Sequence, residues 1–464
     1  MQPTPTPPAT PDDVEQSLYA KRIKIYPREV HGRFATVRVV FASLTLGLYY
    51  LLPWLNWGTN RQAFLIDLPG RKFNLFELTF YPQDLFYLTT LLIISALSLF
   101  LFTAILGRVW CGFTCPQTVW TEIFLWIERK IEGDRPKQMR LAQQAWNAEK
   151  LGKVGGKHAL WIVFALWTGF TFVGYFTPIR ELGAALVANA LGPWETFWIV
   201  FYGFATYGNA GWLREQVCLY MCPYARFQSA MFDRDTLIVS YDRARGEPRG
   251  ARARNVDAGA KGLGSCIDCT LCVQVCPTGI DIRNGLQYAC IACAACADVC
   301  DSVMDKMGYA KGLVRYTTEN ALDGKPQRVL RPRVLIYSAI LAGLCLALIT
   351  AVLARVPAHL EVLHDRNQLY RDSGDGRVEN VYTLKIMNMD RHPHRYSVRL
   401  RGLDAAQLVL DQAEIAIEGG QSASIPARVQ APPQAQTRTP IVFEMSAHDD
   451  PRLRDDEKGV FLSP

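Results

Sequence analysis

The sequence predicts a multi-domain membrane protein: a five-span α-helical bundle, an inserted bacterial-type 2[4Fe–4S] ferredoxin module and a C-terminal β-sandwich. Three observations predict this fold class. Half of the 464 residues are hydrophobic, only 20% are charged, and the apolar residues fall in long uncharged runs. Eight closely spaced cysteines lie between the fourth and fifth runs. After the fifth run, short alternating segments such as Tyr382–Met387 and Ile441–Met445 indicate β-strands.

Each long apolar run is matched to a bilayer, whose core of about 30 Å needs roughly 20 apolar residues in a helix. The five predicted spans are about 37–55, 85–106, 159–179, 196–213 and 334–354. We expect six consecutive segments: a flexible tail at 1–36, a four-span membrane domain at 37–242, a basic Arg/Gly linker at 243–264, the ferredoxin domain at 265–333, the fifth transmembrane helix at 334–356 and the β-sandwich at 357–464.

Positive charge predicts the orientation in the membrane. Residues 1–38 and the connection 107–158 carry fifteen Lys and Arg, whereas the connections 56–84 and 180–195 carry four. Lys and Arg concentrate on the cytoplasmic side, so the N-terminus and the ferredoxin module are predicted to be cytoplasmic and the C-terminal domain to lie outside. The net charge of +7 is mild. It favours contact with membrane lipid and gives no support to nucleic-acid binding.

The strongest motif is a pair of cysteine runs, Cys266-x2-Cys269-x2-Cys272-x3-Cys276-Pro277 and Cys290-x2-Cys293-x2-Cys296-x3-Cys300. In bacterial two-cluster ferredoxins each run lends its last cysteine to the other cluster. The predicted ligands are therefore Cys266, Cys269, Cys272 and Cys300 for one [4Fe–4S] cluster, and Cys290, Cys293, Cys296 and Cys276 for the other. Zinc sites favour pairs of cysteines, and disulfides are disfavoured in the cytoplasm. Asp301 replaces the expected proline after Cys300, which predicts a changed turn or cluster potential.

A second motif, C-x3-C-P, occurs at Cys111–Cys115 and again, 107 residues later, at Cys218–Cys222. Each proline favours the end of a helix, so each helical hairpin is predicted to present two thiols at the cytoplasmic membrane boundary. If the hairpins pack with pseudo-symmetry, the four thiols converge. They could then bind copper(I), exchange dithiol and disulfide, or hold another metal. The alternative is that they are small packing residues.

Several functional classes find no support in the sequence. None of the seven histidines lies inside a predicted span, which argues against a membrane cytochrome with bis-histidine haem. There is no Walker loop, dinucleotide fingerprint or G-x-S-x-G sequence, so a nucleotide-driven pump and a hydrolase are not indicated. The lone Cys345, inside the fifth span, is interpreted as an apolar filler.

The order of these parts resembles that of the cytochrome c oxidase accessory protein family, known as CcoG, FixG or RdxA. The resemblance is carried by the segments 110–117, 218–228 and 364–371 together with the two-cluster module. It implies an immunoglobulin-like C-terminal domain in the periplasm of a bacterium. It further implies a role at the inner membrane in assembling cbb3-type oxidases, with reduction of Cu(II) to Cu(I) and with oxidase subunits or copper-delivery proteins as partners. The twin C-x3-C-P motifs are also similar to quinol-linked ferredoxins such as NapH.

We therefore predict an oxidoreductase, a cupric reductase, in which electrons reach two [4Fe–4S] clusters and then the catalytic thiols. Those thiols are Cys111, Cys115, Cys218 and Cys222, where copper is bound. One alternative is a quinol-linked respiratory electron carrier. Another is a non-enzymatic assembly scaffold whose clusters sense the redox state. The electron donor and the oligomeric state, including a homodimer, stay open at the level of the sequence.

Overall fold

The computed structural model describes residues 24–464 except 58–60, 255, 257–260, 366–367 and 374–375. Most of the predicted tail 1–36, and part of the predicted linker 243–264, therefore lie outside the described residues. The chain divides into two compact units, Met1–Leu55 with Ser95–Ile340 and Asn56–Ile94 with Leu341–Pro464. The helices α3 (Leu85–Leu106) and α15 (Pro332–Leu353) each begin in one unit and end in the other.

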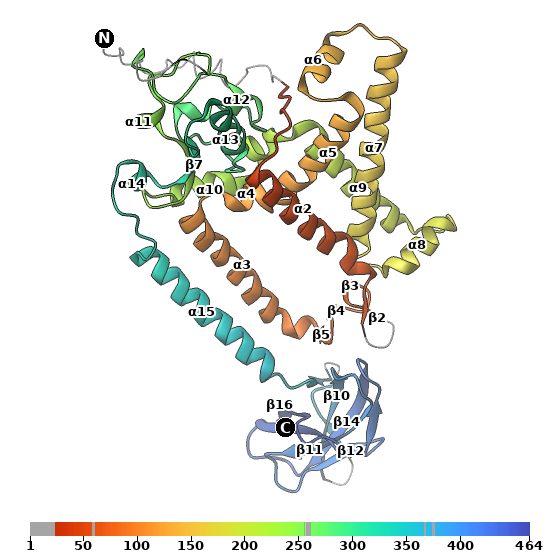
Figure 1. The fold of residues 1–464 in the computed structure, drawn as a ribbon. Helices are drawn as coiled ribbons and strands as arrows, with labels where there is room; N and C mark the ends of the chain where they lie inside the picture. Colours follow the sequence, from red (N-terminus) through yellow and green to blue (C-terminus); the bar gives the residue numbers. More distant parts are fainter. Residues whose placement is uncertain (1–23, 58–60, 255, 257–260, 366–367, 374–375) are drawn as a thin grey trace, which may run out of the picture. The chain divides into compact units, whose positions relative to one another are not determined.

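The first unit is built mainly from helices, several of which begin at prolines (Figure 1). Pro116, Pro193 and Pro223 occupy the first position of α5, α9 and α10, where the missing backbone N–H costs nothing. Asn147 caps α7 by accepting a 2.8 Å hydrogen bond from the backbone N–H of Lys150. The elements are α2 (Arg33–Leu51), η1 (Leu52–Trp54), α4 (Val109–Phe113), α5 (Pro116–Glu132), α6 (Arg135–Gln143), α7 (Ala148–Val173), α8 (Ile179–Val187), α9 (Pro193–Thr206), the π-helical η3 (Tyr207–Leu213) and η4 (Val217–Met221), and α10 (Pro223–Met231).

Three helical segments among the described residues are long and apolar enough to cross a membrane: Arg33–Trp54, Pro82–Leu106 and Pro332–Leu353. They coincide with the first, second and fifth predicted spans, and none of the residues of α2 is buried. The third and fourth predicted spans fall on α7 and on α9 with η3. The first turns of α7 carry Lys150, Lys153 and Lys157, and α9 has only 14 residues. Membrane association follows from these helices, and the five-span count stays a prediction.

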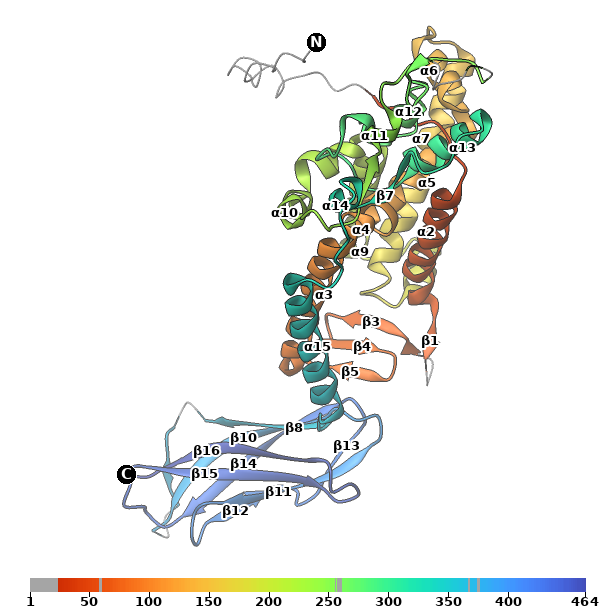
Figure 2. The ribbon, with the colours of Figure 1, turned by 60° about the vertical axis from the view of Figure 1, so that its left-hand side comes forward.

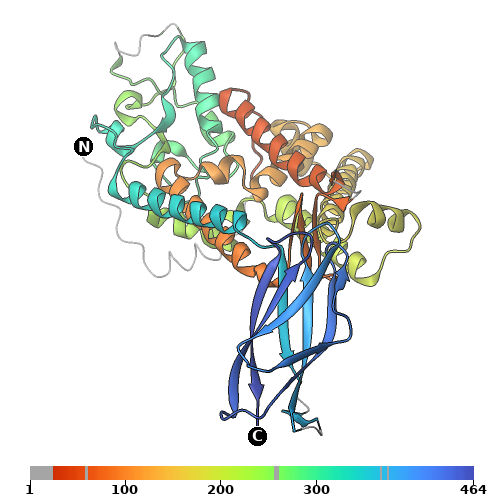
Figure 3. The ribbon, with the colours of Figure 1, turned by 90° about the horizontal axis from the view of Figure 1, so that it is seen from below.

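The cysteine-rich module is closed by a two-stranded antiparallel sheet. In it β6 (Ile238–Tyr241) pairs with β7 (Val314–Thr317), so its first strand precedes the predicted linker. Between them lie α11 (Arg243–Gly246), α12 (Leu271–Gln274), η6 (Ile282–Asn284) and α13 (Ala295–Met307), and α14 (Glu319–Leu322) follows. Because Asp301 replaces the proline found at Pro277, α13 continues for two more turns, and Asp301 accepts a 2.8 Å hydrogen bond from the backbone N–H of Gly312. Figures 2 and 3 show α13 beside the start of α2.

The second unit contains the β-sandwich, which is confirmed (Figure 2). One sheet has the order β12-β14-β10-β8, with β9 also paired to β10, and the other has the order β13-β11-β15-β16. Tyr382, Tyr396, Phe443 and Phe461 are fully buried between the sheets. The strands are β8 (Ala358–His364), β9 (Arg371–Asp372), β10 (Val378–Asn388), β11 (His394–Arg401), β12 (Gln407–Leu410), β13 (Ile415–Ile417), β14 (Ser422–Ala431), β15 (Arg438–Ala447) and β16 (Arg454–Leu462).

The connection between the first two predicted spans folds as small sheets of the same unit. They comprise β1 (Asn56–Trp57), β2 (Arg61–Gln62), β3 (Phe64–Asp67), β4 (Lys72–Leu75) and β5 (Leu78–Phe80), followed by η2 (Pro82–Asp84). Asp84 pairs with Arg355 at 2.5 Å, and both side chains are about nine-tenths buried. Arg355 also donates to the carbonyl oxygen of Thr79 at 3.0 Å. This buried ion pair joins the 56–84 connection to the chain that leads into the sandwich.

We expect Asp84→Ala to destabilise the second unit by about 3 kcal/mol, because the Arg355 cation would remain buried without its carboxylate. The measurement is the denaturant midpoint of the detergent-purified protein. The control is Glu77→Ala, which removes an exposed ion pair to Arg391 at 3.6 Å and is expected to cost less than about 1 kcal/mol. Equal midpoints for the two variants would contradict a structural role for the Asp84–Arg355 pair.

Candidate functional site

The two cysteine loops, 266–272 and 290–296, share one backbone conformation. In both, the residues flanking the middle cysteine have positive φ angles: 54° at Asp268, 56° at Thr270, 53° at Ala292 and 55° at Ala294. For residues other than glycine the left-handed conformation costs about 1–2 kcal/mol. Its alternation with negative φ turns successive N–H groups into one concavity that favours anions. The N–H of Ala292, for example, points at the sulfur of Cys290 at 3.4 Å. The loops are thus shaped to surround a sulfur-rich anion.

Two apolar cavities separate the eight cysteines of the module into the predicted sets. Cys266, Cys269, Cys272 and Cys300 line one cavity. Cys276, Cys290, Cys293 and Cys296 line the other, and Cys272 contributes to the lining of both. Each cavity therefore takes three cysteines from one loop and one from the far end of the other run. The cysteine set and the cavity fit a cubane cluster, whose thiolates attach to different irons and need not converge on one point.

Burial in these cavities disfavours the free thiolate form of cysteine. Burial raises the pKa of Cys290 and of Cys300 to about 12, and that of Cys272 to about 11. The neighbouring cysteines raise the pKa of Cys300 further, Cys272 first among them. Cysteine ligates a metal as thiolate, so these cavities hold charged sulfur only when positive charge enters with it. The iron ions of a [4Fe–4S] cluster supply that charge.

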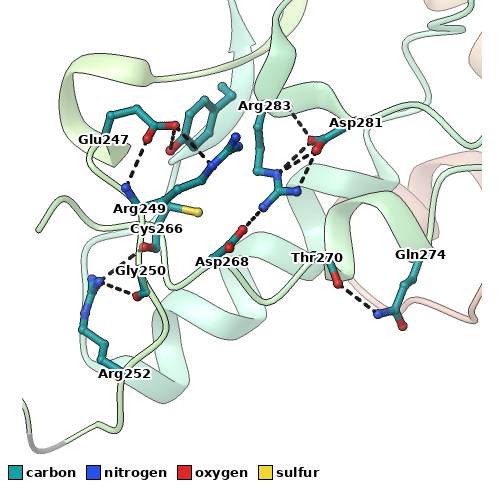
Figure 4. Close-up of polar contacts among 11 residues, drawn as sticks. Glu247, Arg249, Gly250, Arg252, Cys266, Asp268, Thr270, Gln274, Asp281 and Arg283 are labelled. Carbon is teal, nitrogen blue, oxygen red and sulfur yellow. Dashed lines mark hydrogen bonds and ion pairs between the residues drawn. The ribbon is translucent and has the colours of Figure 1, made fainter. Parts of the chain in front are cut away.

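Arginines hold the first loop in place (Figure 4). The guanidinium of Arg283 donates to Asp281 at 2.8 Å from Nε and at 2.6 Å from Nη2, and it also binds Asp268. Arg252, from the predicted basic linker, donates to the carbonyl oxygens of Cys266 and Gly250, each at 3.2 Å. The described part of that linker is therefore attached to the module, and its charge lies against backbone carbonyls of the loop.

The C-x3-C-P motifs lie at the junctions between short helices. Cys115 and Cys222 are the residues immediately before α5 and α10, and both have extended backbone, as a following proline requires. Cys111 lies on α4 and Cys218 on the π-helical η4. The two cysteines of the first motif therefore do not share one regular α-helix, because α4 ends at Phe113, before Cys115.

All four motif thiols nevertheless form one group. Burial raises the pKa of Cys111 to about 12, and the charges of Cys115 and Cys218 raise it further. Burial likewise raises the pKa of Cys218 to about 11, with Cys115 and Cys222 adding to the effect. These mutual effects are those of two motifs that lie near each other. Within the described chain, no three His, Cys, Asp or Glu side chains are gathered tightly enough to hold a single metal ion.

Gln228, on α10, is a polar partner of this group. The thiol of Cys111 lies 3.5 Å from Gln228 Oε1. The side chain of Gln228 is fully buried, and its Nε2 has no hydrogen-bond partner among the described residues. A buried amide donor without a partner costs about 1–3 kcal/mol. A hydrogen-bond acceptor bound among the four motif cysteines would remove that cost.

The two sulfur groups touch through backbone. A Cβ placed on Gly112, next to Cys111, would lie 2.8 Å from the carbonyl oxygen of Ile291 and 2.9 Å from Cα of Cys293. Arg108 adds hydrogen bonds to the carbonyl oxygens of Cys290 at 3.2 Å and Ala225 at 2.7 Å. The first C-x3-C-P motif therefore packs directly on the cysteine loop 290–296.

The first membrane helix is also anchored at this loop. Arg38, on α2, donates a 2.8 Å hydrogen bond to the carbonyl oxygen of Cys293. The carboxylate of Asp298, on α13, accepts from the N–H groups of Phe34 at 3.0 Å and Ala35 at 2.7 Å. A carboxylate at the start of a helix satisfies unpaired amides and interacts favourably with the helix dipole. The second cysteine loop is thus fixed at the membrane boundary end of α2.

All twelve predicted site cysteines lie in the first unit, whereas Cys345 lies on α15 in the second. Three contributors were not singled out from the sequence: Gly112, Arg108 and Gln228. Gly112 offered a signal, since it is the small residue beside a motif cysteine. Arg108 was counted only as a loop charge, and nothing in the local sequence marks Gln228.

Two cysteine-lined cavities that share Cys272, together with membrane-length helices, define a membrane-associated protein of the two-cluster [4Fe–4S] class. Known families agree with this class. A family described as "4Fe-4S dicluster domain" matches residues 213–319, "4Fe-4S binding domain" matches 88–133, and "IG-like fold at C-terminal of FixG" matches 348–464. Both C-x3-C-P motifs fall inside the matched iron–sulfur regions.

Relatives match most of the chain. The nitrogen fixation protein FixG of Rhizobium meliloti is 40% identical over 85% of this chain and 82% of its own length. From Cereibacter sphaeroides, RdxB is 40% identical over 95% of this chain and 93% of its own length, and RdxA is 42% identical over 84% of each. The chain therefore belongs to the FixG/RdxA family of iron–sulfur electron-transfer proteins.

We expect Gly112→Ala to disturb the cysteine loop 290–296, because the added methyl group must displace backbone rather than a flexible side chain. Overpacking of this kind costs about 1–3 kcal/mol. The measurement is iron and acid-labile sulfide per chain, with the EPR spectrum of the dithionite-reduced protein. Fewer irons or an altered spectrum is the expected result.

The matched control is Gly155→Ala on α7, where an added Cβ meets nothing within 4 Å. This control should keep the full iron content and the wild-type spectrum. If Gly112→Ala gave the same iron content and spectrum as Gly155→Ala, the packing of the thiol motif on the loop would have no bearing on the clusters.

Proposed function

We propose that this protein reduces Cu(II) to Cu(I) at Cys111, Cys115, Cys218 and Cys222, in support of the assembly of a cbb3-type haem–copper oxidase. The observation that carries the proposal is the contact of Gly112 with the loop 291–293. It holds the thiol group directly against the loop of one proposed cluster. An electron reaching that cluster is therefore next to thiols suited to a soft metal ion.

The proposed ligands of the clusters are Cys266, Cys269, Cys272 and Cys300, and Cys290, Cys293, Cys296 and Cys276. When bound, [4Fe–4S] clusters supply one-electron steps. Arginines surround the second loop: Arg108 donates a hydrogen bond to the carbonyl oxygen of Cys290, and Arg38 donates one to the carbonyl oxygen of Cys293. Copper is the substrate. Thiolate is a soft ligand that favours Cu(I), so a thiolate of this group would retain the reduced ion better than the oxidised one.

We also propose that the sulfur sites face the cytoplasm and the sandwich faces the periplasm. The excess of Lys and Arg at 1–36 and 107–158 supports this orientation. The grouping of segments supports it too, because the connection 56–84 shares a unit with the sandwich through Asp84 and Arg355. The sandwich contains no cysteine and needs no disulfide in an oxidising compartment.

A C-terminal reporter tests the orientation. Alkaline phosphatase fused after Pro464 should be active and green fluorescent protein fused there should be dark, since the first folds only in the periplasm and the second only in the cytoplasm. Fusions at residue 150 should give the opposite pair. A fluorescent C-terminal fusion would overturn the proposed orientation while leaving the cluster assignment untouched.

Copper reduction is tested anaerobically with dithionite-reduced, desalted protein and a Cu(I)-specific chelator. The double variants Cys111→Ser/Cys115→Ser and Cys218→Ser/Cys222→Ser should each slow Cu(I) formation by roughly tenfold or more, because serine oxygen is a hard, weakly coordinating donor for Cu(I). Their iron content should stay at the wild-type value, since neither pair belongs to the proposed cluster ligands.

Cys345→Ser provides the matched control, a cysteine replaced on α15 in the other unit. Its rate should equal that of the wild type. Unchanged rates in both double variants would reject the thiols as the site of copper reduction. A second check uses Cys269→Ser, which should remove an EPR signal while leaving Cu(I) binding to the protein intact.

A further inference from the structure

A cavity of about 790 Å³ lies in the first unit between α2, α5 and the cysteine module. Its lining is drawn from segment 25–46, from α5 and from the loops around Pro277 and Ile291. Small-molecule sites usually have 300–1,000 Å³, are mostly apolar and contain a few placed polar groups. The cavity is far larger than a metal ion needs, and no role assigned so far uses it.

One side of the cavity belongs to a membrane helix. Val39, Ala42 and Leu46, on α2, line it. They belong to the segment Arg33–Trp54, which is long and apolar enough to cross a membrane, and α2 itself has no buried residue. Trp126, on α5, adds an aromatic surface. An occupant can therefore keep an apolar tail along a helix surface that faces lipid.

The other side carries hydrogen-bonding groups. Thr118, Thr121 and Glu122, on α5, line the cavity together with Arg129. Glu122 and Arg129 form a 3.1 Å ion pair, with the Glu122 side chain 46% exposed. The hydroxyl of Thr118 donates a 2.6 Å hydrogen bond to the carbonyl oxygen of Cys111. The polar side of the cavity is thus linked to the thiol motif by one hydrogen bond.

The cavity also reaches both sulfur groups. Cys218, from the thiol group, and Cys293, from the second cysteine loop, both contribute to its lining. A molecule that fills it is within contact of a residue of each redox site. A soluble donor protein would require an exposed docking face, whereas this cavity requires a small redox-active amphiphile.

We propose that the cavity binds a membrane quinol and that this quinol is the electron donor for the iron–sulfur clusters. The inference rests on the proposed function only in naming the donor of that pathway. The quinol ring would lie against Thr121 and Glu122, close to Cys293, and its isoprenoid tail would follow Ala42 and Leu46 along α2.

The reaction balances in electrons and protons without a further reactant. A quinol loses both O–H protons and two electrons as its two C–O bonds become carbonyl groups. The cysteine sets at the two cavities would hold clusters able to accept these electrons one at a time, and two Cu(II) ions would receive them, giving two Cu(I). The two protons leave by way of the Glu122 carboxylate, which is partly exposed and can release them.

The test measures quinol binding and cluster reduction separately from copper reduction. Oxidised, cluster-containing protein in detergent is mixed anaerobically with decylubiquinol or with menadiol, and bleaching near 410 nm reports cluster reduction. Binding of decylubiquinone is followed by quenching of tryptophan fluorescence. Wild-type protein should bind the quinone and be bleached by at least one of the two quinols.

Ala42→Trp should fill the cavity and slow bleaching by roughly tenfold, with loss of fluorescence quenching. The matched control is Val40→Trp, which places the same side chain on α2 at a 51% exposed position outside the cavity lining. It should behave as wild type. Glu122→Gln is the second variant. It keeps the size of the side chain but removes the proton acceptor, so it should slow bleaching by more than it weakens quinone binding.

The outcomes separate this inference from the proposed function. If neither quinol bleaches the wild type, or if Ala42→Trp matches Val40→Trp in binding and rate, the quinol site is wrong. Cu(II) reduction by dithionite-reduced protein would then still stand. If the quinols bleach the clusters but Cu(II) reoxidises neither wild type nor variants, the quinol site holds and the copper assignment fails.

Discussion

The site depends on one close approach of two backbones. Gly112 has no side chain, so α4 can lie directly on the loop 291–293. Any larger residue would hold the thiol motif away by the thickness of a side chain, in an interior that is packed too closely to absorb it. Arg108 fixes the same junction from the other side by binding carbonyl oxygens of two separate segments. The cysteine loop 290–296 and the first C-x3-C-P motif are adjacent because of this contact.

The sequence predicted those features of the structure that are determined by residues close together in the chain. The spacing of the eight cysteines predicted their division between two cavities, and alternation predicted strands such as β10 and β15. Gly112 and Arg108 could not be predicted in their roles, because their partners lie about 180 residues further along the chain. The positive φ angles at Ala292 and Ala294 could not be predicted either, because alanine, unlike glycine, is not typical of that conformation.

Buried charge explains why the third and fourth spans were difficult to define from the sequence. Lys157 lies at the start of the apolar run on α7, yet it is buried and pairs with Glu132 at 2.7 Å. Arg214, taken as the end of the fourth span, binds Glu128 at 2.7 Å inside the same group. Burial alone would raise the pKa of Glu128, but Arg214, Lys24 and Lys157 hold it below its usual range. Charged residues that look like loop residues in the sequence thus form a buried network of ion pairs between helices.

The proposed orientation does not depend on how this network meets the membrane. The helices α7 and α9 pack against each other, with only α8 between them in the chain, so the proposed orientation treats them as a pair that either crosses the bilayer or does not. Crossing gives five spans and not crossing gives three, and both numbers are odd. In either case the chain that begins on one side at α2 ends on the opposite side after α15. In the proposed orientation the sulfur sites are therefore assigned to the side of the N-terminus for either count, because a helical pair returns the chain to the side from which it entered.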